Sequence, residues 1–150
     1  MIRITRQSDS GLMLLGVLAR DDGRDSWPAS DLAAETHLPL AMVSKILKGL
    51  ARAGIIASQR GARGGYRLDR DPAEVSVDEI LTALEGPIAL VECTDPAGDC
   101  EKQCFCDLHP SWERINRAIR DTLRGITLAD MVGPMTELPR RAASALEKLN

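Results

Sequence analysis

A helical segment with two opposed faces, residues 40–53, constrains the fold of this chain more than any other stretch of its sequence. Apolar residues recur along one side at the i, i+3, i+4 and i+7 spacing, which predicts that this side packs into a core. They are Val43, Ile46, Leu47 and Leu50. The opposite side begins with small residues and is cationic along its length; its members are Ala41, Ser44, Lys45, Lys48 and Arg52. The segment therefore needs neighbouring elements to cover its apolar side only.

The flanking segments predict a winged helix–turn–helix. The expected elements are helices at 10–19, 30–36 and 40–53, and strands at 55–58 and 66–68. Ser30 is suited to cap the short second helix, and Pro39 is suited to open the third. Gly54 can end that third helix, and the glycine-rich stretch 59–65 predicts a hairpin tip. The fold class that we expect is mainly α with a small β-hairpin wing.

The cationic helix face and the hairpin tip together predict a DNA-binding surface. Short side chains followed by Lys and Arg allow a helix to enter the major groove, and Arg beside a glycine-rich tip suits the narrow minor groove. The wing candidates are Arg60, Arg63 and Arg67, in addition to the helix residues Ala41, Ser44, Lys45, Lys48 and Arg52. A solvated basic face beside an ordinary hairpin would explain each half separately. The ordered combination favours DNA binding.

The charge is unevenly divided, although the net charge of the chain is −3. Residues 1–70 carry 11 Lys and Arg against 7 Asp and Glu, and residues 71–150 carry 8 against 15. A basic first half permits local phosphate binding, because such fields act within about 10 Å at ordinary salt. The sequence has no apolar stretch long enough to span a membrane and no secretory signal at its start, so we expect a cytoplasmic protein with reduced thiols.

All four cysteines lie in one short polar span, Cys93-x6-Cys100-x3-Cys104-x-Cys106, with His109 three residues later. Proline, glycine and aspartate between them disfavour regular structure, so a bound metal is a candidate for ordering this loop. Disulfides are disfavoured in a reducing compartment. Zinc sites usually use closer pairs of ligands, whereas an iron–sulfur cluster tolerates looser spacing and occasional histidine. Zinc and an iron–sulfur cluster both stay open, and the cluster is favoured.

A long amphipathic helix is expected from about residue 111 to 126, after this loop. Its apolar seam consists of Trp112, Ile115, Ile119, Leu123 and Ile126. Such a seam can cover its own core, but a small winged domain offers little core to cover, so we expect a homodimer interface. Two recognition helices about 34 Å apart would then read a palindromic operator. Upstream, Ser76 begins a capping box for a helix that Gly86-Pro87 ends, and Thr127 is suited to cap a brief helical turn.

The sequence resembles the Rrf2 family of transcription regulators. The matching stretches are Val43-Ser44-Lys45-Ile46-Leu47-Lys48, Ala53-Gly54-Ile55-Ile56, Arg60-Gly61-Ala62-Arg63-Gly64-Gly65-Tyr66-Arg67-Leu68, Ser76-Val77-Asp78-Glu79-Ile80 and Leu84-Glu85-Gly86-Pro87. Within that family, the approach Ile88-Ala89-Leu90-Val91-Glu92-Cys93 and the run Trp112, Ile115 and Asn116 resemble regulators of the SUF iron–sulfur assembly system. The resemblance implies a winged-helix dimer whose Arg60 enters the minor groove. Members often carry glutamate where Ser44 stands, which leaves the operator sequence open.

The same resemblance implies the ligands of an iron–sulfur cluster. The family cysteines fall on Cys93, Cys100 and Cys106. The fourth ligand is His109 by preference, with Cys104 or Asp9 as alternatives, and Asp9 would come from a partner subunit. A [2Fe–2S] cluster is favoured over [4Fe–4S].

We therefore expect one Rrf2-type domain with four regions. These are a DNA-binding region at 1–70, a connection at 71–92, a cluster loop at 93–109, and a dimerisation helix with its tail at 110–150. The expected function is a repressor of iron–sulfur assembly genes that senses cluster status and is not an enzyme. The alternatives are a nitric-oxide, redox or iron sensor of another regulon, a zinc-stabilised interaction module, and a thiol enzyme.

Overall fold

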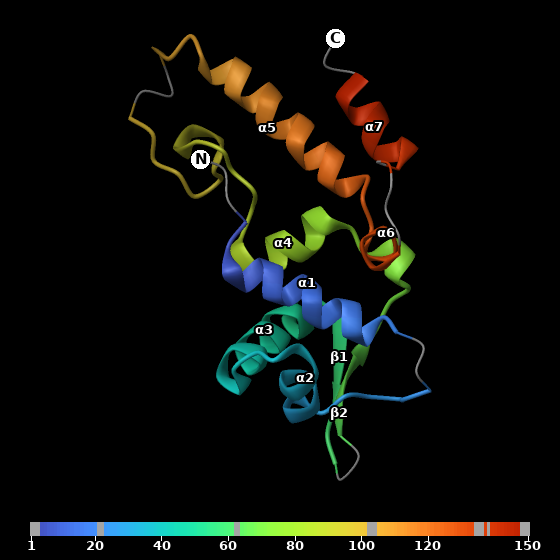
Figure 1. Ribbon diagram of the computed structural model, residues 1–150. Helices are drawn as coiled ribbons and strands as arrows, with labels where there is room; N and C mark the ends of the chain where they lie inside the picture. Colours follow the sequence, from blue (N-terminus) through green and yellow to red (C-terminus); the bar gives the residue numbers. More distant parts are fainter. Residues whose placement is uncertain are drawn as a thin grey trace.

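The computed structural model describes residues 4–20, 23–61, 64–101, 105–133, 137 and 139–147 (Figure 1). Its elements in chain order are α1 Arg6–Leu18, α2 Ala29–Thr36, α3 Leu40–Arg52, β1 Ile56–Gln59, β2 Gly65–Leu68, η1 Pro72–Glu74, α4 Val77–Glu85, η2 Glu92–Thr94, α5 His109–Arg124, α6 Leu128–Val132 and α7 Arg140–Glu147. The prediction of a mainly helical fold with a hairpin wing is confirmed. None of the helices within the described ranges combines the length and the apolar character needed to cross a membrane.

Helix boundaries follow local capping chemistry, and the first two helices begin earlier than expected. The first helix begins at Arg6 because the Thr5 side chain accepts a hydrogen bond from the Ser8 N–H. Ser30 was wrongly expected to cap the second helix. Pro28 holds the capping position, and Ser30 lies inside the first turn. Pro39 precedes α3 as expected, and Gly54 adopts the left-handed φ of 70° that follows the end of that helix.

The first four helices, the hairpin and Leu128 of α6 share one hydrophobic core. Its fully buried side chains include Leu14, Leu15, Leu32, Val43, Ile46, Leu47, Leu50, Ile55, Val75, Ile80 and Leu128. The apolar side of α3 is therefore buried as predicted, with each of its four members at most 1% exposed. Burial of each such side chain stabilises the fold by about 1.5–3 kcal/mol. This packing holds α3 with its cationic side outward.

A second packing unit is formed by α5, α7 and one side of α4. Figure 1 shows α5 beyond α4, on the side away from α2 and the hairpin, with α7 next to it. A smaller core joins Val77 and Leu81 of α4 to Ile126 and Ala142, and Leu123 packs against it. Thr127 caps α6 as predicted. Its hydroxyl accepts a hydrogen bond from the Asp130 N–H, and the Asp130 carboxylate accepts one from the Thr127 N–H. Thus α4 lies between α5 and the winged helix–turn–helix formed by α1–α3 and the hairpin.

Candidate nucleic-acid interface and cysteine loop

The outer side of α3 is open to solvent, as an interface with DNA requires. Ala41, Lys45, Lys48 and Arg52 are exposed, and Ser44 is half-buried. They border a hollow of about 380 Å³ that is also lined by Gln7 of α1 and Leu84 of α4. Among the described residues, no ion pair is formed by Lys45, Lys48 or Arg52. Their charges are therefore available to phosphate groups.

The wing supplies further cations. Arg60 follows β1 at the start of the tip, is exposed, and likewise has no ion pair within the described part of the chain. Arg67 is also exposed, but its guanidinium lies 3.8 Å from the carboxylate of Asp69. Arg63 lies outside the described residues. We refer to Lys45, Lys48, Arg52 and Arg60 as the four exposed cations.

The base of the wing is braced by a segment that sequence reasoning missed. The backbone of Trp27 exchanges two hydrogen bonds of 2.8 Å with the backbone of Tyr66, which extends the two-stranded ladder sideways. Gly65 permits this approach, because a Cβ there would come within 2.6 Å of the Trp27 carbonyl carbon. The Arg24 guanidinium stacks 4.1 Å from the centre of the Trp27 ring. Trp27, 39 positions before Tyr66 in the sequence, carried no local signal of this pairing.

The cysteine loop leads from the end of α4 into α5. Cys93 lies in η2, and Cys93, Cys100 and Cys106 are free, half-buried thiols. Cys104 lies outside the described residues. His109 is the first residue of α5, and its Nε2 atom lies 3.3 Å from the Cys93 carbonyl oxygen and 3.9 Å from the Glu113 carboxylate. The fold thus brings the preferred fourth ligand next to the first cysteine.

The electrostatics of these thiols indicate that they affect one another. Burial raises the pKa of the Cys93 thiol. Charge repulsion from Cys100, Cys106 and Glu113 raises that pKa further, whereas a backbone hydrogen bond lowers it. Neighbouring thiolates destabilise one another, and a bound metal cation offsets this repulsion. The donor set therefore matches the chemistry of a thiolate-bound metal centre.

The donors are not gathered at ligand distance. Within the described part of the chain, no three Cys, His, Asp or Glu side chains come together closely enough to hold a metal ion. Asp9, the alternative ligand expected from a partner subunit, lies exposed in the first turn of α1. The residues fit a metal centre by type and by neighbourhood, and the loop would have to close around the metal.

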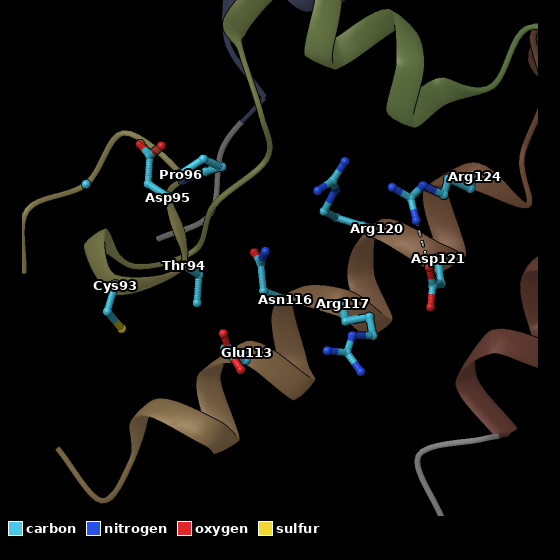
Figure 2. A pocket seen from close by; sticks show the side chains of 11 residues that line it. Cys93, Thr94, Asp95, Pro96, Glu113, Asn116, Arg117, Arg120, Asp121 and Arg124 are labelled. Carbon is cyan, nitrogen blue, oxygen red and sulfur yellow. Dashed lines mark hydrogen bonds and ion pairs between the residues drawn. The ribbon is translucent and has the colours of Figure 1, made fainter. Parts of the chain in front are cut away.

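A groove of about 530 Å³ separates the loop from α5. Figure 2 shows Cys93 and Thr94 on the loop side, and Glu113, Asn116 and Arg117 on the helix side. Farther along α5, the guanidinium groups of Arg120 and Arg124 donate hydrogen bonds to the Asp78 carboxylate of α4. The groove therefore reaches from Cys93 to the contact between α5 and α4.

The expected dimer seam divides into an accessible part and a buried part. Trp112 and Ile119 are half-buried, and Ile115 is 43% exposed. Leu123 packs on the smaller core of its own chain, and Ile126, which follows α5, is only 9% exposed within that core. A second subunit could thus contact the seam at Trp112, Ile115 and Ile119, whereas Leu123 and Ile126 pack within their own subunit.

The known proteins that this chain resembles in sequence are transcriptional regulators. A model of the Rrf2 family, described as an iron-dependent transcriptional regulator, matches residues 4–134. An rrf2-like helix–turn–helix transcriptional regulator of Rhodobacter capsulatus is 31% identical over 137 residues, which cover 86% of this chain and 91% of that protein.

Solved structures extend the similarity to the fold. IscR of T. potens matches with a TM-score of 0.66 at 27% identity, covering 87% of this chain and 86% of that one. CymR, the global cysteine regulator of B. subtilis, matches with a TM-score of 0.68 at 29% identity, covering 88% of this chain and 97% of that one. The winged architecture is therefore shared with these regulators.

Proposed function

This chain belongs to the Rrf2 family of transcriptional regulators, and from that premise we propose that it represses iron–sulfur assembly genes in response to its own cluster. The family consists of DNA-binding regulators rather than enzymes, so the thiol-enzyme alternative has no support. The observation that carries the proposal is that one loop holds three free, half-buried thiols, Cys93, Cys100 and Cys106, and that His109 Nε2 lies 3.3 Å from the Cys93 carbonyl oxygen.

The residues that would hold the cluster are Cys93, Cys100 and Cys106, with His109 as the preferred fourth ligand. Cys104 and Asp9 of a second subunit are the alternatives. A [2Fe–2S] cluster is favoured over [4Fe–4S]. When bound, the cluster would make the loop sensitive to iron supply and to oxidation, because both change whether it persists.

The residues that would hold DNA are the four exposed cations together with Ala41, Ser44 and the wing residues Arg63 and Arg67. In a homodimer paired through Trp112, Ile115 and Ile119, two α3 helices would seat in successive major grooves of a palindromic operator. Such seating requires a spacing of about 34 Å between the helices. A small change in the pairing of the subunits therefore alters how well both helices fit at once.

The test of the cofactor is the iron and acid-labile sulfide content of protein purified without oxygen, together with its visible absorption. We expect a coloured protein with iron and sulfide in equal amounts. Cys93→Ala should lose both, whereas Ser30→Ala, an exposed substitution in α2, should keep them. Comparing His109→Ala, Cys104→Ala and Asp9→Ala then identifies the fourth ligand. Colourless protein that contains zinc would instead support the zinc-stabilised module.

A second candidate function is sensing of redox state, nitric oxide, iron or cysteine for another regulon. The similarity to CymR favours it, because that protein is a cysteine regulator and shares the winged fold at 29% identity. Free thiols are the groups that such a sensor would use. An iron-free protein whose operator affinity changes with thiol oxidation would establish the thiol-based redox form of this alternative.

A further inference from the structure

The segment that leads into the cysteine loop is tied to α5 by one buried side chain. Asn116 is 8% exposed, although asparagine is usually found on the surface. Its Oδ1 atom accepts a hydrogen bond of 3.1 Å from the Leu90 N–H, and its Nδ2 atom donates one of 3.2 Å to the Ile88 carbonyl. Leu90 is three residues before Cys93. The start of the loop is thereby held against the helix.

An amide is suited to this position because it donates and accepts at the same time. Asn116 uses both capacities on one short piece of backbone, in the way that a neighbouring strand would. That piece of backbone lies in no helix or strand, so the side chain of Asn116 satisfies groups that no backbone ladder serves. A displacement of residues 88–90 therefore strains or breaks this contact with α5.

The same helix carries a second tie, to α4. The Arg120 and Arg124 guanidinium groups bond to Asp78 at distances of 3.1–3.4 Å. The side chain of Asp78 is only 8% exposed. Asn116, Arg120 and Arg124 are spaced by four residues, which places them along one side of α5. Figure 2 shows Arg120 and Arg124 farther along this helix from the cysteine loop than Asn116.

The contact at Asp78 connects α5 to the helices of the winged helix–turn–helix. Asp78 lies in the first turn of α4, and α4 packs directly against α1 and α3. Leu84 of α4 also borders the hollow beside the cationic side of α3. A contiguous set of hydrogen bonds and packed helices therefore runs within one subunit from the residues before Cys93 to α3.

We propose that Asn116 is a positioning residue that couples the cysteine loop to the DNA-binding helix α3. Asp78 is the second residue of this coupling, because it connects α5 to α4. The inference rests on the proposed function, since it needs a loop whose state changes. Loading of the loop moves residues 88–90, Asn116 transmits the movement to α5, and Asp78 transmits it to α4 and α3. Without these ties, metal and DNA bind independently.

The test compares operator affinity in metal-loaded and metal-free forms of each variant. Asn116→Leu removes both hydrogen bonds at similar volume, and Asn116→Asp keeps only the bond from the Leu90 N–H. The control is Thr122→Val, because the Thr122 hydroxyl donates a hydrogen bond to the Ala118 carbonyl of the same helix and, among the residues that the structure describes, to no other element. Coupling between sites is typically 5- to 150-fold. We expect the wild type and Thr122→Val to show about 10-fold or more, Asn116→Leu less than about 2-fold, and Asn116→Asp a value between them.

Two further measurements make the outcome decisive. Iron content should stay at the wild-type level in Asn116→Leu, and hydrogen exchange of residues 88–91 in the metal-free protein should accelerate. If Asn116→Leu fails to fold, Asp78→Asn replaces it, with the same expected loss of coupling. Either variant overturns the inference if it keeps the wild-type ratio of affinities. Equal affinities of the two wild-type forms would overturn the proposed switch as well, whereas failure of the inference alone leaves the wild-type ratio intact.

Discussion

Replacing Lys48 by alanine removes one of the four exposed cations from each subunit while leaving the core side of α3 intact. Lys48 lies on the solvent side of the helix, whereas Leu47 and Leu50 beside it in sequence are fully buried. The substitution should therefore leave the thermal stability close to that of the wild type. Its effect should appear in how the binding of DNA depends on salt.

The size of that effect follows from the number of unpaired cations. If each of the four exposed cations meets one phosphate, they neutralise about eight phosphates in a dimer. These contacts contribute about −7 to the slope of the logarithm of the binding constant against the logarithm of salt concentration. Lys48→Ala removes two of these contacts per dimer, so their contribution should become about −5 and the measured slope should be less steep by about 2. Between 50 and 200 mM salt, these contacts should account for a loss of affinity of about 10⁴-fold in the wild type and about 10³-fold in the variant.

The assay is fluorescence anisotropy with labelled operator DNA over this range of salt. Arg20→Ala is the matched control, because Arg20 is an exposed arginine that is ion-paired with Glu35 at 2.8 Å and lies outside α3 and the wing. Its slope should equal that of the wild type. An unchanged slope for Lys48→Ala, or an equal change for Arg20→Ala, would refute the assignment of the outer side of α3 to DNA.

Three other substitutions test separate parts of the structure. Gly65→Ala should lower the free energy of unfolding by about 1–3 kcal/mol and weaken operator binding, because the new Cβ collides with the Trp27 backbone; wild-type affinity would contradict the brace. Leu47→Ala should cost about 2–5 kcal/mol in urea unfolding, since Leu47 is fully buried, and a loss below about 1 kcal/mol would contradict the core assignment. Hydrogen bonds from Thr127 and the charge of Arg141 hold the pKa of Asp130 below its ordinary 3.8, so its stabilisation is present above that value and is lost as the pH falls through the lower folded-state pKa. Asp130→Asn should therefore be less stable at neutral pH and lose less stability on acidification, as followed by thermal unfolding; parallel pH profiles would contradict this.

Local patterns were sufficient to predict the DNA-binding half of the fold. The spacing of Val43, Ile46 and Leu47 identified the buried side of α3, and Gly54 marked the end of that helix. These signals depend on neighbours within one or two turns, so they can be recognised in the sequence. The error at Ser30 has a local cause too, because Pro28 in an extended conformation begins the helix two residues earlier.

Contacts between distant residues could not be predicted in this way. The pairing of Trp27 with Tyr66, and the bond from Arg120 to Asp78, join residues about 40 positions apart, and no periodicity reports them. The cysteine spacing predicted a common metal site within the span that holds all four cysteines, and the family resemblance selected Cys93, Cys100 and Cys106 as its ligands. It could not predict their arrangement, because thiolate ligands take up their final geometry together with the metal. The same reason leaves His109, Cys104 and Asp9 as competing fourth ligands.

The most direct measurement is repression of an operator-driven reporter in cells, by the wild type and by Cys93→Ala, with iron supplied and with iron withheld. The account predicts that repression by the wild type changes with iron supply, whereas repression by Cys93→Ala stays at one level under both conditions. If repression by Cys93→Ala changed with iron supply as it does for the wild type, the result would contradict the claim that the cysteine loop controls how tightly α3 binds DNA.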